Sequence, residues 1–224
     1  MFLLVGAYAP NQLGEKIKKS IEEIKIMKEL KVRITFLQEL LGTQTGDKDV
    51  YKSFIGSKAP DATKLEEEVA NVGVDEVIDK GKTFFPRVNG EPIIYDYQIK
   101  GFFKEACKAL SKVDGMKSKD LKAYKQQIDL RIFVKDRCNP LKNFDEVTEF
   151  QRPIRCSTPQ GERISLAISE MLPIGTTCEF TIQCLMDSDV KLVEEWLDYG
   201  AFHGFLQFRN GGFGKFKWEK ISLA

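Results

Sequence analysis

The sequence lacks most of what marks metal sites, disulfide frameworks and strongly basic nucleic-acid binders. It has five cysteines and a single histidine, His203, and no two cysteines stand at the CxxC spacing of zinc sites or redox motifs. We therefore expect reduced thiols, no metal and no cofactor. The 34 basic and 33 acidic residues leave a net charge of only +1, so an anion-binding site must come from local clustering of cations.

Long apolar runs and targeting signals are also missing. No apolar stretch reaches the roughly 18 residues that span a bilayer. The apolar start, residues 1–5, is short and lacks a basic segment. We expect a cytoplasmic protein without a membrane anchor. The segment 42–46, Gly-Thr-Gln-Thr-Gly, lacks the Gly-Lys-Ser/Thr ending of a phosphate-binding loop, which argues against a nucleoside triphosphatase.

The hydrophobic pattern predicts six principal elements in a chain of 224 residues, which is long enough to bury a core. Their order is strand, helix, strand, strand, helix, strand, over residues 31–37, 97–112, 130–134, 176–185, 190–199 and 213–221. Asp96 is the predicted N-cap of the first helix. This order predicts an α+β class, ferredoxin-like (βαββαβ) fold, an antiparallel sheet with both helices on one face.

Further segments elaborate this domain, which we predict to span residues 31–224. Residues 1–30 are predicted as an N-terminal extension with a helix over 14–30. Insertions are predicted at about 42–95 and 138–173. The second insertion contains a predicted β-hairpin, with arms over 152–158 and 163–169 around Pro159-Gln-Gly161.

The most distinctive stretch is 200–218, which interleaves five glycines with aromatic residues and cations. Glycine lets a ligand approach the backbone, cations attract phosphate, and exposed rings stack on bases. We expect phosphate contacts from Arg209 and Lys215 and from the amides near Gly211, Gly212 and Gly214, and base stacking by Phe208 or by its neighbours Phe205 and Phe213. Strand alternation instead places Phe216 and Trp218 in the core. A tight turn whose phenylalanines fill the core is the alternative.

Arginines of the predicted hairpin form a second candidate contact surface. Arg152, Arg155 and Arg163 carry guanidinium groups, whose two parallel N–H donors suit phosphate. Ordinary surface charge is the alternative. His203 has no Ser, Tyr or Lys partner at a recognisable spacing, so we assign no catalytic residue.

A glycine-rich loop between the last helix and last strand of a ferredoxin-like domain resembles the RAMP superfamily of CRISPR-associated RNA-binding proteins. The residues that carry the resemblance are Gly200, Gly204, Gly211, Gly212 and Gly214, with Arg209 among them. In backbone subunits of that superfamily an extended hairpin often touches the neighbouring subunit or the bound strand. The resemblance implies the same for this hairpin, and a backbone subunit rather than a nuclease.

The sequence also resembles a family of uncharacterised bacteriophage and prophage proteins, over about residues 31–219. The segments that carry this likeness are 36–43 (FLQELLGT), 54–61 (FIGSKAPD), Phe85-Pro86, 95–106 (YDYQIKGFFKEA), 159–163 (PQGER), 195–200 (EWLDYG) and 208–210 (FRN). It implies no established activity. It implies a location in the host-cell cytoplasm.

These features together predict a non-enzymatic RAMP-like phage protein that binds single-stranded RNA or DNA with weak sequence preference and assembles with copies of itself. Two alternatives stay open. One is a protein-interaction module that inhibits a host defence complex, with a host defence protein as its partner. The other is a metal-independent ribonuclease that uses His203 as its base.

Overall fold

A computed structural model describes residues 28–45, 82–158 and 161–221, with only the backbone described for 156–158 and 162–165. Most of the predicted N-terminal helix, most of the first predicted insertion, and Pro159 and Gln160 therefore lie outside the described residues. None of the described helices is long and apolar enough to cross a membrane.

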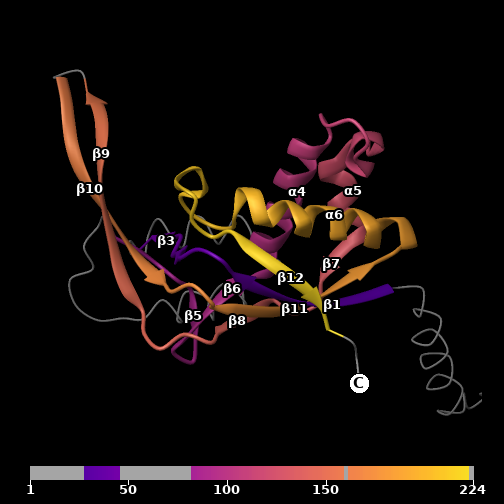
Figure 1. Cartoon of the computed structure of the whole chain (residues 1–224), viewed down its shortest axis with the longest axis horizontal. Helices are drawn as coiled ribbons and strands as arrows, with labels where there is room; N and C mark the ends of the chain where they lie inside the picture. Colours follow the sequence, from indigo (N-terminus) through magenta and orange to yellow (C-terminus); the bar gives the residue numbers. More distant parts are fainter. Residues whose placement is uncertain (1–27, 46–81, 159–160, 222–224) are drawn as a thin grey trace, which may run out of the picture.

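Four antiparallel strands form the predicted ferredoxin-like sheet. They are β1 (Lys28–Phe36), β7 (Ile132–Val134), β11 (Thr177–Cys184) and β12 (Phe216–Lys220). β1 lies between β12 and β11, and β7 pairs with β11, so the order across the sheet is β12-β1-β11-β7. Two long helices, α4 (Asp96–Leu110) and α6 (Asp187–His203), lie on one face of this sheet (Figure 1). The predicted α+β, ferredoxin-like fold is confirmed.

The core lies between this sheet and its helices. Alternate residues of β1 point inward, because successive side chains of a strand face opposite sides. Leu30, Val32, Ile34 and Phe36 are buried, while the residues between them lie on the outer face. From the helices, Phe103 and Trp196 are fully buried with their ring centroids 5.6 Å apart, which joins α4 to α6 over the sheet.

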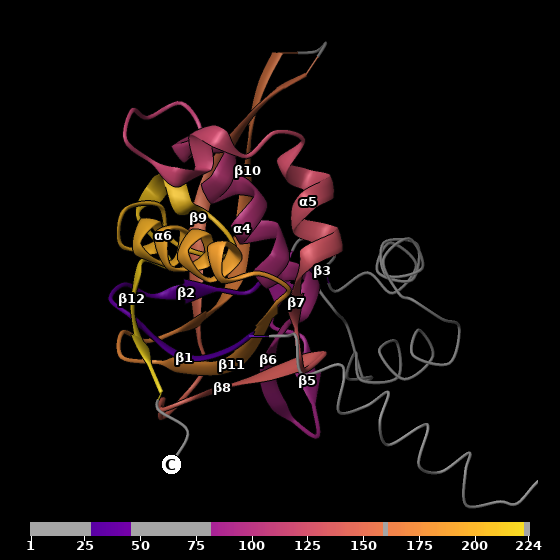
Figure 2. The ribbon, with the colours of Figure 1, turned by 90° about the vertical axis from the view of Figure 1, so that its right-hand side faces the viewer.

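Several predicted boundaries were wrong. β1 begins at Lys28, so the end of the predicted 14–30 helix is strand. α4 begins at Asp96, and its N-cap is Tyr95, whose backbone N–H donates to the Gln98 side chain at 2.8 Å. A short helix, α5 (Tyr124–Arg131), takes the first residues predicted for the strand 130–134. The helices α4, α5 and α6 lie on the same side of the sheet (Figure 2).

Segments from both predicted insertions extend the sheet beyond β11. β8 (Cys138–Lys142) pairs with β11 and with β6 (Glu91–Tyr95), which in turn pairs with β5 (Arg87–Val88). Pro140 lies within β8 opposite Ile93 of β6. Because these strands lie beside the sheet of the core, Ile94 and Leu141 are buried in the same hydrophobic cluster as β1.

A second, smaller sheet carries the predicted hairpin. β9 (Thr148–Thr158) and β10 (Gly161–Leu172) pair antiparallel along their whole length and project from the body (Figure 1). Both arms are longer than predicted: β9 begins four residues earlier than predicted, and β10 ends three residues later. The remaining members of this sheet are β2 (Leu40–Leu41), β3 (Gln44–Thr45) and β4 (Lys82–Phe84).

Candidate nucleic-acid interface

The glycine-rich loop begins later than the sequence suggested. α6 continues to His203, so the first residues of the predicted loop are helical. Gly200 is buried on this helix, and a Cβ added there would lie 2.1 Å from Cζ of Phe216. Real Cβ contacts are never this close, so Gly200 lets α6 lie directly on β12. The loop proper, called the glycine loop below, is residues 204–215.

Two glycines close the neck of the glycine loop. A Cβ on Gly204 would lie 2.3 Å from the carbonyl oxygen of Phe213, and one on Gly214 would lie 2.2 Å from that of Phe205. The Phe205 N–H donates to the Gly214 carbonyl at 2.9 Å, and the Gly214 N–H donates to the Glu39 carbonyl at 2.8 Å. The two ends of the loop therefore cross at van der Waals contact, which holds the residues between them in place.

The backbone amides that we expected to hold phosphate already have acceptors. The Gly211 N–H donates to the Phe208 carbonyl at 2.9 Å, and the Gly212 N–H donates to the Arg209 carbonyl at 2.8 Å. The Gly214 N–H donates to the Glu39 carbonyl, as described above. Gly212 has a φ of +92° and nothing within 4 Å of a Cβ position, so it faces open space. These glycines shape the loop and leave its surface accessible rather than presenting amide donors.

The aromatic residues of the glycine loop divide into core and surface groups. Phe205 is buried, with its ring edge-on to Phe102 at 5.5 Å. Phe208 and Phe213 are half-buried and stack on each other, with centroids 5.5 Å apart and planes at 29°. Downstream, Phe216 is buried and Trp218 packs partly buried against the core, as strand alternation predicted. Only Phe208 and Phe213 are therefore left for stacking on a ligand.

The hairpin meets the glycine loop at these two rings. Phe150 of β9 lies with its centroid 4.8 Å from that of Phe213, and Arg152, two residues on and on the same face of the strand, places its guanidinium carbon 3.7 Å from the centroid of Phe208. On β4, which pairs with the other arm of the hairpin, Thr83 donates a hydrogen bond to Gln207 of the loop at 3.1 Å. We call the set Phe150, Arg152, Phe208 and Phe213 the loop–hairpin surface.

The predicted cations differ in whether a carboxylate already neutralises them. Arg209 bonds to Glu105 of α4, whose other oxygen lies 3.1 Å from Nε2 of His203. Arg152, exposed Arg155 and half-buried Lys215 have no ion pair with any described residue. The backbone of Arg163 lies opposite Cys156 in the ladder, and its side chain lies outside the described part.

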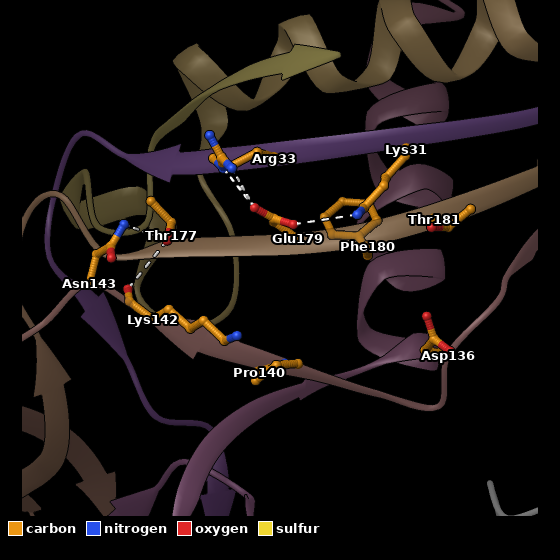
Figure 3. Close-up of a pocket in the computed structure, with 10 residues that line it drawn as sticks. All are labelled: Lys31, Arg33, Asp136, Pro140, Lys142, Asn143, Thr177, Glu179, Phe180 and Thr181. Atoms are coloured by element: carbon orange, nitrogen blue, oxygen red, sulfur yellow. Dashed lines mark hydrogen bonds and ion pairs between the residues drawn. The ribbon is translucent and has the colours of Figure 1, made fainter. Parts of the chain in front are cut away.

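A second cationic area lies on the outer face of the main sheet, the face that the helices leave open. It surrounds a hollow of about 520 Å³ lined by Lys31, Arg33, Lys142, Glu179 and their neighbours (Figure 3). Glu179 lies between Arg33, at 2.6 Å, and Lys31, at 3.7 Å. These bonds hold the pKa of the Glu179 carboxyl below its usual value.

This hollow suits a polyanion less well than the loop–hairpin surface does. Two of its three cations form ion pairs with Glu179, and Arg33 also bonds to Glu219 at 3.1 Å, so two carboxylates offset these two charges. The one aromatic residue that lines it, Phe180, is buried at 4% exposure. It thus offers one cation without an ion pair among the described residues, Lys142, and no exposed ring for stacking.

Within the described residues no group of three or more His, Cys, Asp or Glu side chains is placed to hold a metal ion. Cys107, Cys178 and Cys184 are buried free thiols. Burial raises the pKa of Cys178 and of Cys184 to about 12, so both are unreactive in the folded protein.

Phe150 and Glu105 were missed by reasoning from the sequence. Phe150 stands two residues before Arg152, so strand alternation could have placed the ring and the guanidinium on one face. Glu105 lies on α4, 104 residues before its partner Arg209, and no local sequence pattern predicts that contact.

No protein-family model matches this sequence, and no curated protein matches it. The resemblance to phage proteins therefore stays a prediction. The chain is similar to one in the cryo-EM structure of the Type III-B Cmr-beta bound to cognate target RNA, with 13% identity and a TM-score of 0.52 over 96% of this chain and 67% of that one.

Two further solved structures are similar over most of their length. One is a chain of a Type IV-B CRISPR complex, with 11% identity and a TM-score of 0.43 over 88% of this chain and 92% of that one. The other is Cmr6 from Pyrococcus furiosus, with 10% identity and a TM-score of 0.43 over 87% and 98%. Of these three structures, the Type III-B one has a TM-score above 0.5, so it is the one that bears on this chain. At 13% identity it shows the fold alone: a RAMP-like fold of the ferredoxin type.

Proposed function

We propose that this protein binds single-stranded nucleic acid on the loop–hairpin surface, without cleaving it. The observation that carries the proposal is the Arg152 guanidinium 3.7 Å above the ring of Phe208. It joins a cation of the hairpin that has no ion pair with any described residue to a half-buried ring of the glycine loop. Proteins that bind single strands with little sequence preference do so mainly through phosphate contacts and base stacking.

The charges at this surface favour Arg152 over Arg209 as the principal phosphate contact. Arg209 is paired with Glu105, whereas Arg152 has no ion pair with any described residue. Phosphate binding by an unpaired guanidinium releases counterions from the strand without first breaking an ion pair. The backbone amides of Gly211, Gly212 and Gly214 have no part in this proposal, because each already donates to a carbonyl.

We further propose RNA as the natural ligand and a multi-subunit assembly as the setting. The Type III-B structure with the same fold is described as bound to target RNA, which supports the first part. The projecting hairpin, paired along 11 and 12 residues, offers backbone edges and exposed side chains such as Leu166 to a neighbouring copy, which supports the second.

Fluorescence anisotropy with labelled single-stranded RNA and DNA at two salt concentrations tests the proposal. We expect binding at low salt that weakens steeply as salt rises. Arg152→Gln should weaken it about 3- to 10-fold, because one hydrogen bond contributes a net of about 0.5–1.5 kcal/mol. The matched control is Arg33→Gln, which removes the same charge from the outer sheet face and should leave affinity unchanged. Absence of binding at low salt, or equal effects of both substitutions, would refute the proposal.

A protein-interaction module that inhibits a host defence complex is the second candidate. The net charge of +1 and the internal neutralisation of the outer sheet face favour it, since neither attracts a polyanion. Under this proposal a phage-encoded chain with a RAMP-like fold takes the place of a subunit of the host complex. Pull-down of a defence complex from host lysate, undiminished by Arg152→Gln and without RNA binding by the pure protein, would support it over the first.

Cleavage is tested with the same RNA on a denaturing gel. His203 lies 3.1 Å from Glu105 and its ring stacks on Tyr199 at 5.3 Å, so one of its two nitrogens is engaged. We expect intact RNA. Cleavage that disappears in His203→Ala would replace the binding proposal with a metal-independent ribonuclease.

A further inference from the structure

Two side chains, one from the glycine loop and one from the end of α6, meet at the carboxylate of Glu105, which lies far from both in the sequence. Glu105 lies on α4, and one of its oxygens receives Arg209 of the glycine loop. The other oxygen lies 3.1 Å from Nε2 of His203, the last residue of α6. Two nitrogen groups thus converge on one anion from two sides, which is the arrangement in which proteins also bind a phosphate oxygen.

The carboxylate lies at the edge of an open groove between α4 and the glycine loop. The groove has a volume of about 270 Å³, and its lining includes Gly101, Phe102, Leu206 and Arg209. Gly101 has nothing within 4 Å of a Cβ position, so no side chain closes the groove at that point. A nucleic-acid phosphate can therefore reach the place where Glu105 meets Arg209.

The pair is exposed enough to exchange partners. The side chains of Glu105 and Arg209 are 37% and 31% exposed. Surface ion pairs of this kind are worth little, because water screens both charges. A phosphate that takes Arg209 therefore loses little by displacing Glu105, yet until it does so the loop presents no net positive charge at this point.

We infer that Glu105 competes with nucleic-acid phosphate for Arg209. By neutralising Arg209 in the free protein, Glu105 lowers the affinity of the glycine loop for nucleic acid. This inference rests on the proposed function and adds a regulatory residue to the same site. A purely supporting role for Glu105 predicts the reverse, because an Arg209 that needs Glu105 for its orientation would bind phosphate less well without it.

The test is Glu105→Gln in the anisotropy titration with single-stranded RNA over a series of salt concentrations. The amide keeps the shape of the side chain and removes its charge. We expect binding up to about 5-fold tighter at low salt, the upper worth of an exposed ion pair. A plot of log K against log salt should be steeper by about 0.7, the value for one more phosphate contact on a single strand. Adding Arg209→Ala to Glu105→Gln should abolish both changes.

The matched control is Glu219→Gln, which removes an exposed carboxylate from the outer sheet face and changes the net charge equally. If Glu105→Gln binds no more tightly than this control while the wild-type protein binds RNA, the inference fails and the proposed function stands. If neither the wild-type protein nor Glu105→Gln binds at low salt, both fail. If only Glu105→Gln binds, the inference stands and the wild-type chain is held inactive.

Discussion

The contact between Arg152 and Phe208 should couple the hairpin to the glycine loop energetically, and a double-mutant cycle measures that coupling. The guanidinium carbon lies 3.7 Å from the ring centroid, and neither side chain is fully exposed. Cation–π contacts contribute about 0.5–1 kcal/mol at exposed sites and about 2 kcal/mol when desolvated. For this half-buried pair we expect a coupling energy of about 1 kcal/mol.

The cycle compares the free energy of unfolding in urea for the wild type, Arg152→Gln, Phe208→Leu and the double variant. Leucine keeps the apolar contact with Phe213 and removes the ring face. The control cycle pairs Phe208→Leu with Arg155→Gln, because Arg155 lies on the opposite face of β9 and should couple by less than about 0.3 kcal/mol. A coupling energy for Arg152 no larger than that of Arg155 would show that the loop–hairpin surface is not a unit.

Three further predictions concern the body that supports the site. Gly200→Ala should lower the free energy of unfolding by about 1–2 kcal/mol, since the cost of overpacking against Phe216 exceeds the gain in helix propensity. Adding Phe216→Leu should restore part of the lost thermal stability. An unaltered melting temperature for Gly200→Ala alone would contradict this packing. Burial raises the pKa of the Asp189 carboxyl, so the folded state binds its proton more tightly than the unfolded state; lowering the pH through that raised pKa should therefore increase wild-type stability relative to Asp189→Asn in urea titrations, and a difference that does not vary with pH would argue against it. The thiols of Cys178 and Cys184, with pKa values raised to about 12, should react with a thiol reagent at pH 8 only on unfolding, and rapid native labelling counted by mass spectrometry would disprove their burial.

Periodicity and element order were enough to predict the ferredoxin-like core. Buried residues alternate with more exposed ones from Leu30 onward in β1 and from Cys178 onward in β11, and the helix stripes that include Phe103 and Trp196 face them. Alternation also placed Phe216 correctly in the core. These hydrophobic patterns repeat within each strand or helix, so each element could be predicted from its own residues.

The end of α6 shows why the boundary of the loop could not be predicted. Gly200 breaks helix propensity locally, which favoured a loop from that residue onward. In the structure the helix continues for three more residues, because the missing side chain is what lets α6 pack on Phe216. The packing of a strand that comes later in the sequence decides this case, and propensity alone does not include it.

The candidate site was predicted in parts but not as a whole. Its residue types, cations and rings in the glycine loop and on the hairpin, were evident from composition and spacing. Their pairing was not, because the contact of Arg152 with Phe208 and that of Glu105 with Arg209 join residues far apart in the sequence. The second of these contacts moved the main phosphate role in the proposal from Arg209 to Arg152.

The location of the ligand is the central claim, and photocrosslinking tests it most directly. Single-stranded RNA carrying 4-thiouridine would be bound at low salt, irradiated and digested, and the crosslinked peptides identified by mass spectrometry. The account predicts crosslinks in residues 204–215 and in the part of β9 around Arg152. Crosslinks confined to the outer sheet face around Arg33, Lys142 and Glu179 would contradict it.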